Sequence, residues 1–149
     1  MNKNFQKKSG FTLVELLIVI SIIMILVTVG MMSYANAQKV GRDAKRKADL
    51  KQVQSALEMF RADNGFYPKD TSGNISSTLA GPLATSPKIY IQILPSDPNK
   101  TTYNYYYSNA DGGVTYKLCS ALENLNDPDK DASCGNNCGG QCNYVVYNP

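Results

Sequence analysis

The feature that most constrains the fold is an apolar run near the N-terminus, FTLVELLIVISIIMILVTV over residues 11–29. As an α-helix, these nineteen residues span about 28 Å, close to the hydrocarbon thickness of a bilayer. The run therefore predicts a membrane-spanning helix. Its single acidic residue, Glu15, costs about 2–3 kcal/mol in that position, so its presence suggests a functional role.

Polar and basic residues precede the run, as MNKNFQKKSG over residues 1–10. Basic residues here hold the N-terminus in the cytoplasm, so we expect everything after about Tyr34 to lie across the membrane. The small residues Ser9 and Gly10 stand before the run, whereas a secretory signal is cleaved after its apolar core. Cleavage at this point would leave the helix on the mature protein. An uncleaved signal anchor is the alternative, but it leaves Glu15 unexplained.

The charge balance and the amino-acid composition argue against two classes of function, nucleic-acid binding and catalysis. Three of the 15 basic residues lie within residues 1–10, which leaves 12 basic against 12 acidic side chains and argues against general nucleic-acid affinity. Histidine is absent, which removes the Ser-His-Asp and Cys-His nucleophile arrangements and the commonest metal ligand. We therefore expect neither enzymatic activity nor a nucleic-acid partner. A membrane-anchored hydrolase is a further alternative, but the sequence shows no nucleophile–base arrangement that would support it.

The segment KKSGFTLVELLIVISII, residues 7–23, resembles the leader and first helix of type IV pilins and of type II secretion pseudopilins. The resemblance implies that a prepilin peptidase cleaves between Gly10 and Phe11 and that the new Phe11 amine is N-methylated. It implies that Glu15 pairs with the Phe11 amine of a neighbouring subunit. It also implies that identical or homologous subunits polymerise through their apolar helices, served by an assembly platform protein.

The pairing of Glu15 with Phe11 has a physical rationale. Cleavage creates a cation at Phe11 in apolar surroundings, and a nearby carboxylate offsets the desolvation of both charges. The alternative is a contact within one chain, because residues 11 and 15 lie one helical turn apart.

The predicted helix continues well beyond the membrane. Proline is absent up to Asn64-Gly65, a stop signal that is followed by Pro68. We expect a transmembrane and assembly half over 11–33 and an amphipathic half over 34–64, together about 80 Å long. The amphipathic half should pack on a sheet through its apolar residues, Val40, Ala44, Leu50, Val53, Leu57 and Phe60.

Six basic residues make the middle of this helix basic: Lys39, Arg42, Lys45, Arg46, Lys47 and Lys51. A solvated face is one interpretation. Contact with acidic lipid headgroups, an acidic neighbouring subunit or nucleic acid is the other. Residues 97–149 hold six acidic and three basic side chains, which favours subunit contacts that set the register of staggered subunits.

The remainder, residues 65–149, predicts a small globular β-rich domain. Residues 65–102 are rich in Ser, Thr, Gly, Pro and Asn and predict a long surface connection. Two β-prone runs, 103–107 and 114–122, predict a hairpin, and 144–147 predicts a last short strand. The strand tyrosines are interpreted as structural rather than adhesive. The predicted fold class is α+β and pilin-like, a long N-terminal helix packed on a small antiparallel sheet with a disulfide-stapled C-terminal loop.

The cysteines are expected outside the cytoplasm, where an even number predicts disulfides. Two disulfides are therefore expected, and the sequence leaves their pairing open among Cys119, Cys134, Cys138 and Cys142. A zinc site is the alternative, but the C-x3-C-x3-C spacing lacks the usual C-x2-C pairs.

A short acidic segment, DPDKD, precedes the cysteine-rich loop with Asp127, Asp129 and Asp131. Alternate carboxylates can converge on one calcium ion. An EF-hand is excluded, because Ala132 stands where that loop needs glycine. The resemblance to major pseudopilins nevertheless implies a calcium ion in a loop at this end of the domain, and a solvated acidic turn is the alternative.

Our first expectation is a structural subunit of a type IV pilus-like filament. The chain would be a single-pass protein of the cytoplasmic membrane before it enters an extracellular or periplasmic filament. The major pseudopilin of a type II secretion system is the alternative. A monomeric, membrane-anchored extracellular binding module is a second alternative, and it predicts an unprocessed leader and no polymer.

Overall fold

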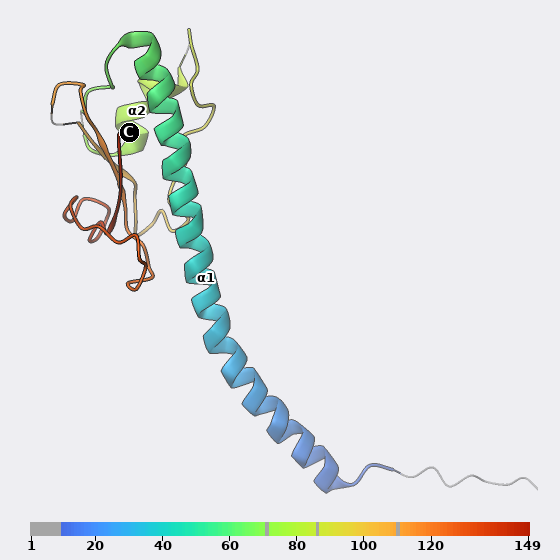
Figure 1. Cartoon of the computed structure of the whole chain (residues 1–149). Helices are drawn as coiled ribbons and strands as arrows, with labels where there is room; N and C mark the ends of the chain where they lie inside the picture. The colour runs from blue at the N-terminus through green and yellow to red at the C-terminus, as the bar shows by residue number, and fades with distance from the viewer. Residues whose placement is uncertain (1–9, 71, 86, 110) are drawn as a thin grey trace, which may run out of the picture. The chain divides into compact units, whose positions relative to one another are not determined.

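The computed structural model describes residues 10–70, 72–85, 87–109 and 111–149 (Figure 1). The basic residues of the expected leader lie outside this range. The described residues form the helices α1 and α2 and the strands β1 to β3, with the bounds α1 Leu13–Asn64, α2 Ile75–Ala84, β1 Tyr106–Ser108, β2 Lys117–Ser120 and β3 Tyr144–Tyr147. The chain divides between Gln38 and Lys39 into two compact units, and α1 contributes to both. The predicted α+β fold is confirmed.

Helix α1 has 52 residues and begins at Leu13 rather than at the predicted Phe11. The later start follows from Thr12, whose hydroxyl accepts from the backbone N–H of Glu15 and so caps the helix. The end at Asn64 agrees with the prediction. Gly65 follows with a φ of 81°, and its N–H donates to the carbonyl of Arg61 at 2.7 Å. Glycine adopts this left-handed conformation without a steric penalty, which explains why the helix stops here.

The apolar stripe of α1 is confirmed in its last part and wrong in its first. Leu50, Val53 and Leu57 are fully buried, and Phe60 packs against the same core. Upstream, the predicted apolar positions Val40 and Ala44 are exposed. Charged side chains take the buried positions of that stretch instead, at Asp43, Arg46 and Asp49.

Helix α2 corrects the expectation that residues 65–102 form a long surface connection, because it lies within this range and packs on the core. Asn74 caps the helix, because its side chain accepts from the backbone N–H of Ser76 at 2.8 Å. The helix buries its apolar face through residues spaced four apart, Ile75, Leu79 and Leu83. The helix was not predicted because small and polar residues separate these apolar positions and are also typical of loops.

The three strands form one antiparallel sheet in the order β1-β2-β3. Tyr107 lies opposite Leu118, which lies opposite Val146, and all three are buried on the face toward the core. The predicted hairpin and last strand are therefore correct. β1 is shorter than predicted, because Asn104 and Tyr105 bond to the backbone of Cys138 and Ile75 instead of to β2.

The buried tyrosines are structural, as interpreted from the sequence. The hydroxyl of Tyr105 donates to Asp49 at 2.7 Å, and that of Tyr107 donates to the carbonyl of Pro68 at 2.6 Å. Tyr67 and Tyr116 both donate to Glu58. Burial raises the pKa of Tyr107 to about 12 and raises the pKa of Tyr105 well above its usual range.

Candidate functional site

The first half of α1 is apolar and uncovered. Among the described residues, α1 is the helix whose length and composition suit a membrane span. Four consecutive residues, 16–19, each expose at least half of their side chains, so no face of this stretch is turned into the protein. Such a helix needs lipid or other apolar helices around it.

The first turn of α1 is closed by a reciprocal pair of hydrogen bonds between Thr12 and Glu15. The Glu15 N–H donates to Thr12 Oγ1 at 3.2 Å, while Glu15 Oε2 accepts from the Thr12 backbone N–H at 2.9 Å. This arrangement is a capping box, in which two N–H groups without helical partners are satisfied together. The T-x-x-E spacing before an apolar run was its sequence signal, and the sequence-based interpretation of Glu15 missed it.

The predicted processing site lies just before the capping box. Gly10 and Phe11 are both exposed and both precede the first helical residue. A Cβ at position 10 would meet nothing within 4 Å, so this fold has no steric need for glycine there.

The middle of α1 carries a buried charge cluster centred on Arg46, which is fully buried. Its Nε and Nη2 donate to the two carboxylate oxygens of Asp97 at 2.7 and 2.9 Å. Its Nη1 donates to Asp43 at 2.7 Å and to Glu123 at 2.9 Å. Burial alone would lower the pKa of Arg46, but these carboxylates raise it instead. The cluster joins α1 to two loops of the domain.

Neighbouring charges extend this cluster. Arg42 donates to Glu123, and together with Arg46 it lowers the pKa of that carboxyl to about 2. Asp43 accepts from the backbone N–H groups of Glu123 and Asn124 at 2.9 and 2.8 Å. The expectation that these basic residues are solvated or contact other subunits is therefore wrong for the buried Arg46, whereas the side chain of Arg42 stays 34% exposed. Their acidic partners lie in the same chain.

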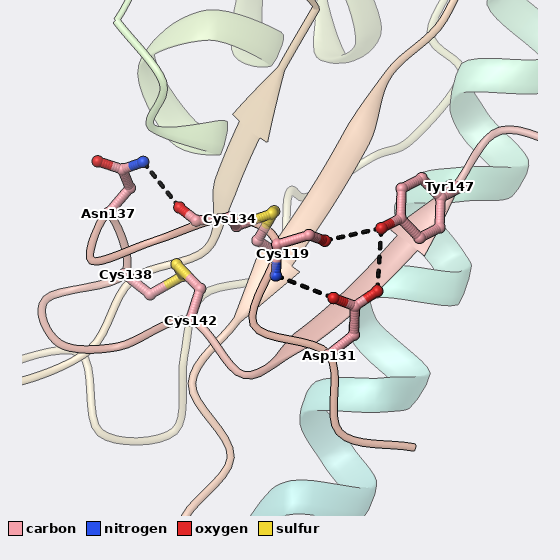
Figure 2. The surroundings of a disulfide bond; sticks show 8 residues. Cys119, Asp131, Cys134, Asn137, Cys138, Cys142 and Tyr147 are labelled. Atoms are coloured by element: carbon pink, nitrogen blue, oxygen red, sulfur yellow. Dashed lines mark hydrogen bonds between the residues drawn. A yellow bond between two sulfur atoms is a disulfide. The ribbon is translucent and has the colours of Figure 1, made fainter.

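The cysteines form two disulfides, Cys119–Cys134 and Cys138–Cys142 (Figure 2). The zinc alternative is thereby contradicted. The first disulfide links β2 to the C-terminal loop, and the second closes a short loop within it. The sequence left the pairing open because several pairings satisfy the same spacing.

The aspartates of the acidic segment accept hydrogen bonds from other side chains of the same protein. Lys47 Nζ donates to both Asp127 and Asp129 at 2.7 Å. Asp131 has a different partner and accepts from the hydroxyl of Tyr147 at 2.9 Å (Figure 2). Within the part of the chain that the structure describes, no three His, Cys, Asp or Glu residues are arranged to hold a metal ion.

Two known families match different parts of this sequence. The family described as type II secretion system (T2SS), protein G, matches residues 33–135, more than half of the chain. The chain belongs to this family. A second family, described as the prokaryotic N-terminal methylation motif, matches residues 5–31 of this protein G family member. The resemblance to pilins and pseudopilins is therefore confirmed.

Individual relatives agree with this assignment. The type II secretion system core protein G of Pseudomonas aeruginosa is 28% identical over 137 residues, which cover 88% of this chain and 96% of the relative. That of Klebsiella pneumoniae is 33% identical over 115 residues, 73% of this chain and 81% of the relative. Competence protein ComGC of Halalkalibacterium halodurans is 35% identical over 68 residues, 46% of this chain and 67% of the relative. No solved structure gives a significant match.

Family membership settles the general role. Protein G family members are structural pseudopilin subunits and are not known as enzymes. This chain is accordingly a subunit of a pilus-like filament built from homologous subunits. Its apolar helix and methylation motif fit a membrane-anchored subunit of such a filament.

Proposed function

We propose that this chain is the major pseudopilin of a type II secretion system. The observation that carries the proposal is the protein G match over residues 33–135, which covers the part of the chain outside the apolar run. Our first expectation was a subunit of a type IV pilus-like filament. The apolar helix suits both kinds of filament, whereas the protein G match favours the pseudopilin.

Maturation is part of the proposal. A prepilin peptidase hydrolyses the Gly10–Phe11 bond and releases residues 1–10. A methyl group is then transferred from a methyl donor to the Phe11 amine, which loses a proton. An exposed, non-helical peptide bond supports the cleavage, since a protease needs its substrate outside a helix. The mature chain keeps residues 11–33 as its transmembrane and assembly segment, with the amphipathic segment 34–64 and the domain 65–149 on the far side of the membrane.

Assembly moves the apolar helix from lipid into contact with neighbouring helices, served by an assembly platform protein. In this proposal Glu15 pairs with the Phe11 amine of a neighbouring subunit. The geometry leaves room for both roles of Glu15. The hydrogen bonds that the Glu15 carboxylate accepts within the described residues both involve Oε2, so Oε1 retains its capacity to accept from an amine.

Two variants separate pairing from capping. Glu15→Gln removes the charge but keeps the cap, because glutamine serves equally at this position of a capping box. Thr12→Val removes the capping hydroxyl and keeps the charge. We expect Glu15→Gln to insert and be cleaved normally but to yield at least about tenfold less filament, the equivalent of one lost ion pair in apolar surroundings. Thr12→Val should assemble nearly as the wild type.

The measurement is the ratio of sedimentable filament to membrane-bound subunit, with the processing of each variant checked by mass. Normal filament yield from Glu15→Gln, together with a reduced yield from Thr12→Val, would assign Glu15 to the helix cap and refute the pairing.

A competence pilus is a second candidate, supported by the similarity of part of the chain to ComGC. Deletion of the gene separates the two functions. Loss of protein export across the outer membrane with DNA uptake intact agrees with the pseudopilin, and the reverse agrees with the competence pilus.

A further inference from the structure

The acidic segment after β2 forms an ion pair with a lysine side chain of the same protein, Lys47. Lys47 lies on α1, and its ammonium donates to Asp127 Oδ1 and to Asp129 Oδ2 at 2.7 Å each. The same Nζ lies 5.4 Å from the centre of the Tyr144 ring, within reach of a cation–π interaction. Three groups that attract a cation therefore surround one ammonium.

The pKa shifts of Lys47 and Asp127 agree with this geometry. Burial alone would lower the pKa of Lys47, but its hydrogen bonds to the two carboxylates outweigh burial and raise the pKa. The hydrogen bond from Lys47 lowers the pKa of Asp127. Both partners are thus held in their charged forms.

The residues present do not fit a calcium ion. Calcium takes about six to eight oxygen ligands, and its usual protein ligands are carboxylates and carbonyls. Asp127 Oδ1 already accepts from Lys47 and from the backbone N–H of Asp129 at 2.9 Å. Asp131 accepts from the N–H of Ser133 and the hydroxyl of Tyr147, both at 2.9 Å. A calcium ion bound between Asp127 and Asp129 would face the ammonium of Lys47 at close range.

The loop is fixed on both sides of this contact. Before it, Asp43 of α1 accepts from the backbone N–H of Asn124 at 2.8 Å. After it, the disulfide of Cys134 ties the chain to β2. Lys47 holds the stretch between these two anchors against the helix.

We propose that the Lys47 ammonium takes the place of a bound divalent cation in this loop, so that the fold of the domain is independent of calcium. The proposal concerns a single subunit and does not rest on which filament the subunit builds.

The test uses the full-length protein in detergent micelles. The near-ultraviolet circular dichroism of its tyrosines reports the tertiary packing during heating, and tryptophan is absent from the chain. Melting is recorded with excess EDTA and with millimolar calcium chloride. Lys47→Met keeps the apolar stem and removes the charge, and Lys45→Met is the matched control on an exposed lysine of the same helix.

We expect the Tm of the wild type to be the same in EDTA and in calcium. In EDTA, Lys47→Met should melt about 4 °C or more below the wild type, and Lys45→Met should stay within about 1 °C of it. A rise in the wild-type Tm on adding calcium would overturn the proposal. Equal melting of Lys47→Met and Lys45→Met would overturn it as well. Neither result bears on filament assembly, so failure here leaves the proposed function standing.

Discussion

At the scale of single residues, the buried Arg46 decides how the domain is attached to its helix. All three of its guanidinium nitrogens donate to carboxylates. Removing one partner of such a buried pair typically costs about 3–5 kcal/mol, because the remaining charge stays buried without compensation. The sequence shows this arginine only as one of several basic residues on a helix. Its partner Asp97 lies 51 residues away, and no local pattern pairs them.

The charge cluster predicts how stability depends on pH. Arg42 and Arg46 lower the pKa of Glu123 from 4.5 to about 2, so the carboxylate binds its proton less tightly when the protein is folded. The stabilisation is fully present above about pH 4.5 and is lost as the pH falls toward 2, by up to about 3 kcal/mol. Urea unfolding across this pH range measures it.

The matched variant for that measurement is Glu123→Gln. It should be less stable than the wild type at neutral pH, and its stability should fall less steeply in acid. Parallel curves for the two proteins would show that Glu123 contributes nothing to the pH dependence.

At the scale of the elements, the helices and strands with a strong local sequence pattern were predicted correctly, and those with a weak pattern were not. The end of α1, the buried stripe from Leu50 to Leu57 and the antiparallel strands were read correctly, because each has a strong periodic or turn signal. Helix α2 was missed because its polar and small residues resemble a loop, and tertiary burial of one face overrides that weak preference. The capping role of Glu15 was not predicted, although the T-x-x-E spacing before an apolar run is typical of a capping box.

Gly41 within α1 and Gly65 just after its end should respond in opposite directions to substitution by alanine. Gly65→Ala should destabilise the domain by about 1 kcal/mol, because the residue after the helix has a φ of 81° and alanine is strained there. Gly41→Ala should stabilise it by about 0.5–1 kcal/mol, because position 41 is exposed inside the helix. A Cβ meets nothing within 4 Å at either site.

Thermal unfolding of both variants checks this prediction. Shifts of Tm in the same direction would contradict the backbone explanation.

At the scale of the whole molecule, the two units of the chain have different sources of stability. The unit from Lys39 onward has its own hydrophobic core and both disulfides. The described part of the first unit is a helix with apolar side chains exposed all round, so its free energy depends on what surrounds it. In the assembly that we propose, lipid would cover this helix before polymerisation and neighbouring helices would cover it afterwards. The apolar run predicts the exposed apolar helix from the sequence alone. The ion pairs of Arg46 that join the domain to α1 could be found only in the structure, because their partners lie far away in the sequence.

The mass of the subunit recovered from assembled filaments tests the central claim most directly. Cleavage at the Gly10–Phe11 bond predicts a chain that begins at Phe11, heavier by one methyl group and lighter by the hydrogens lost in the two disulfides. A native protein that still carries residues 1–10, lacks the methyl group and remains monomeric in the membrane would contradict it.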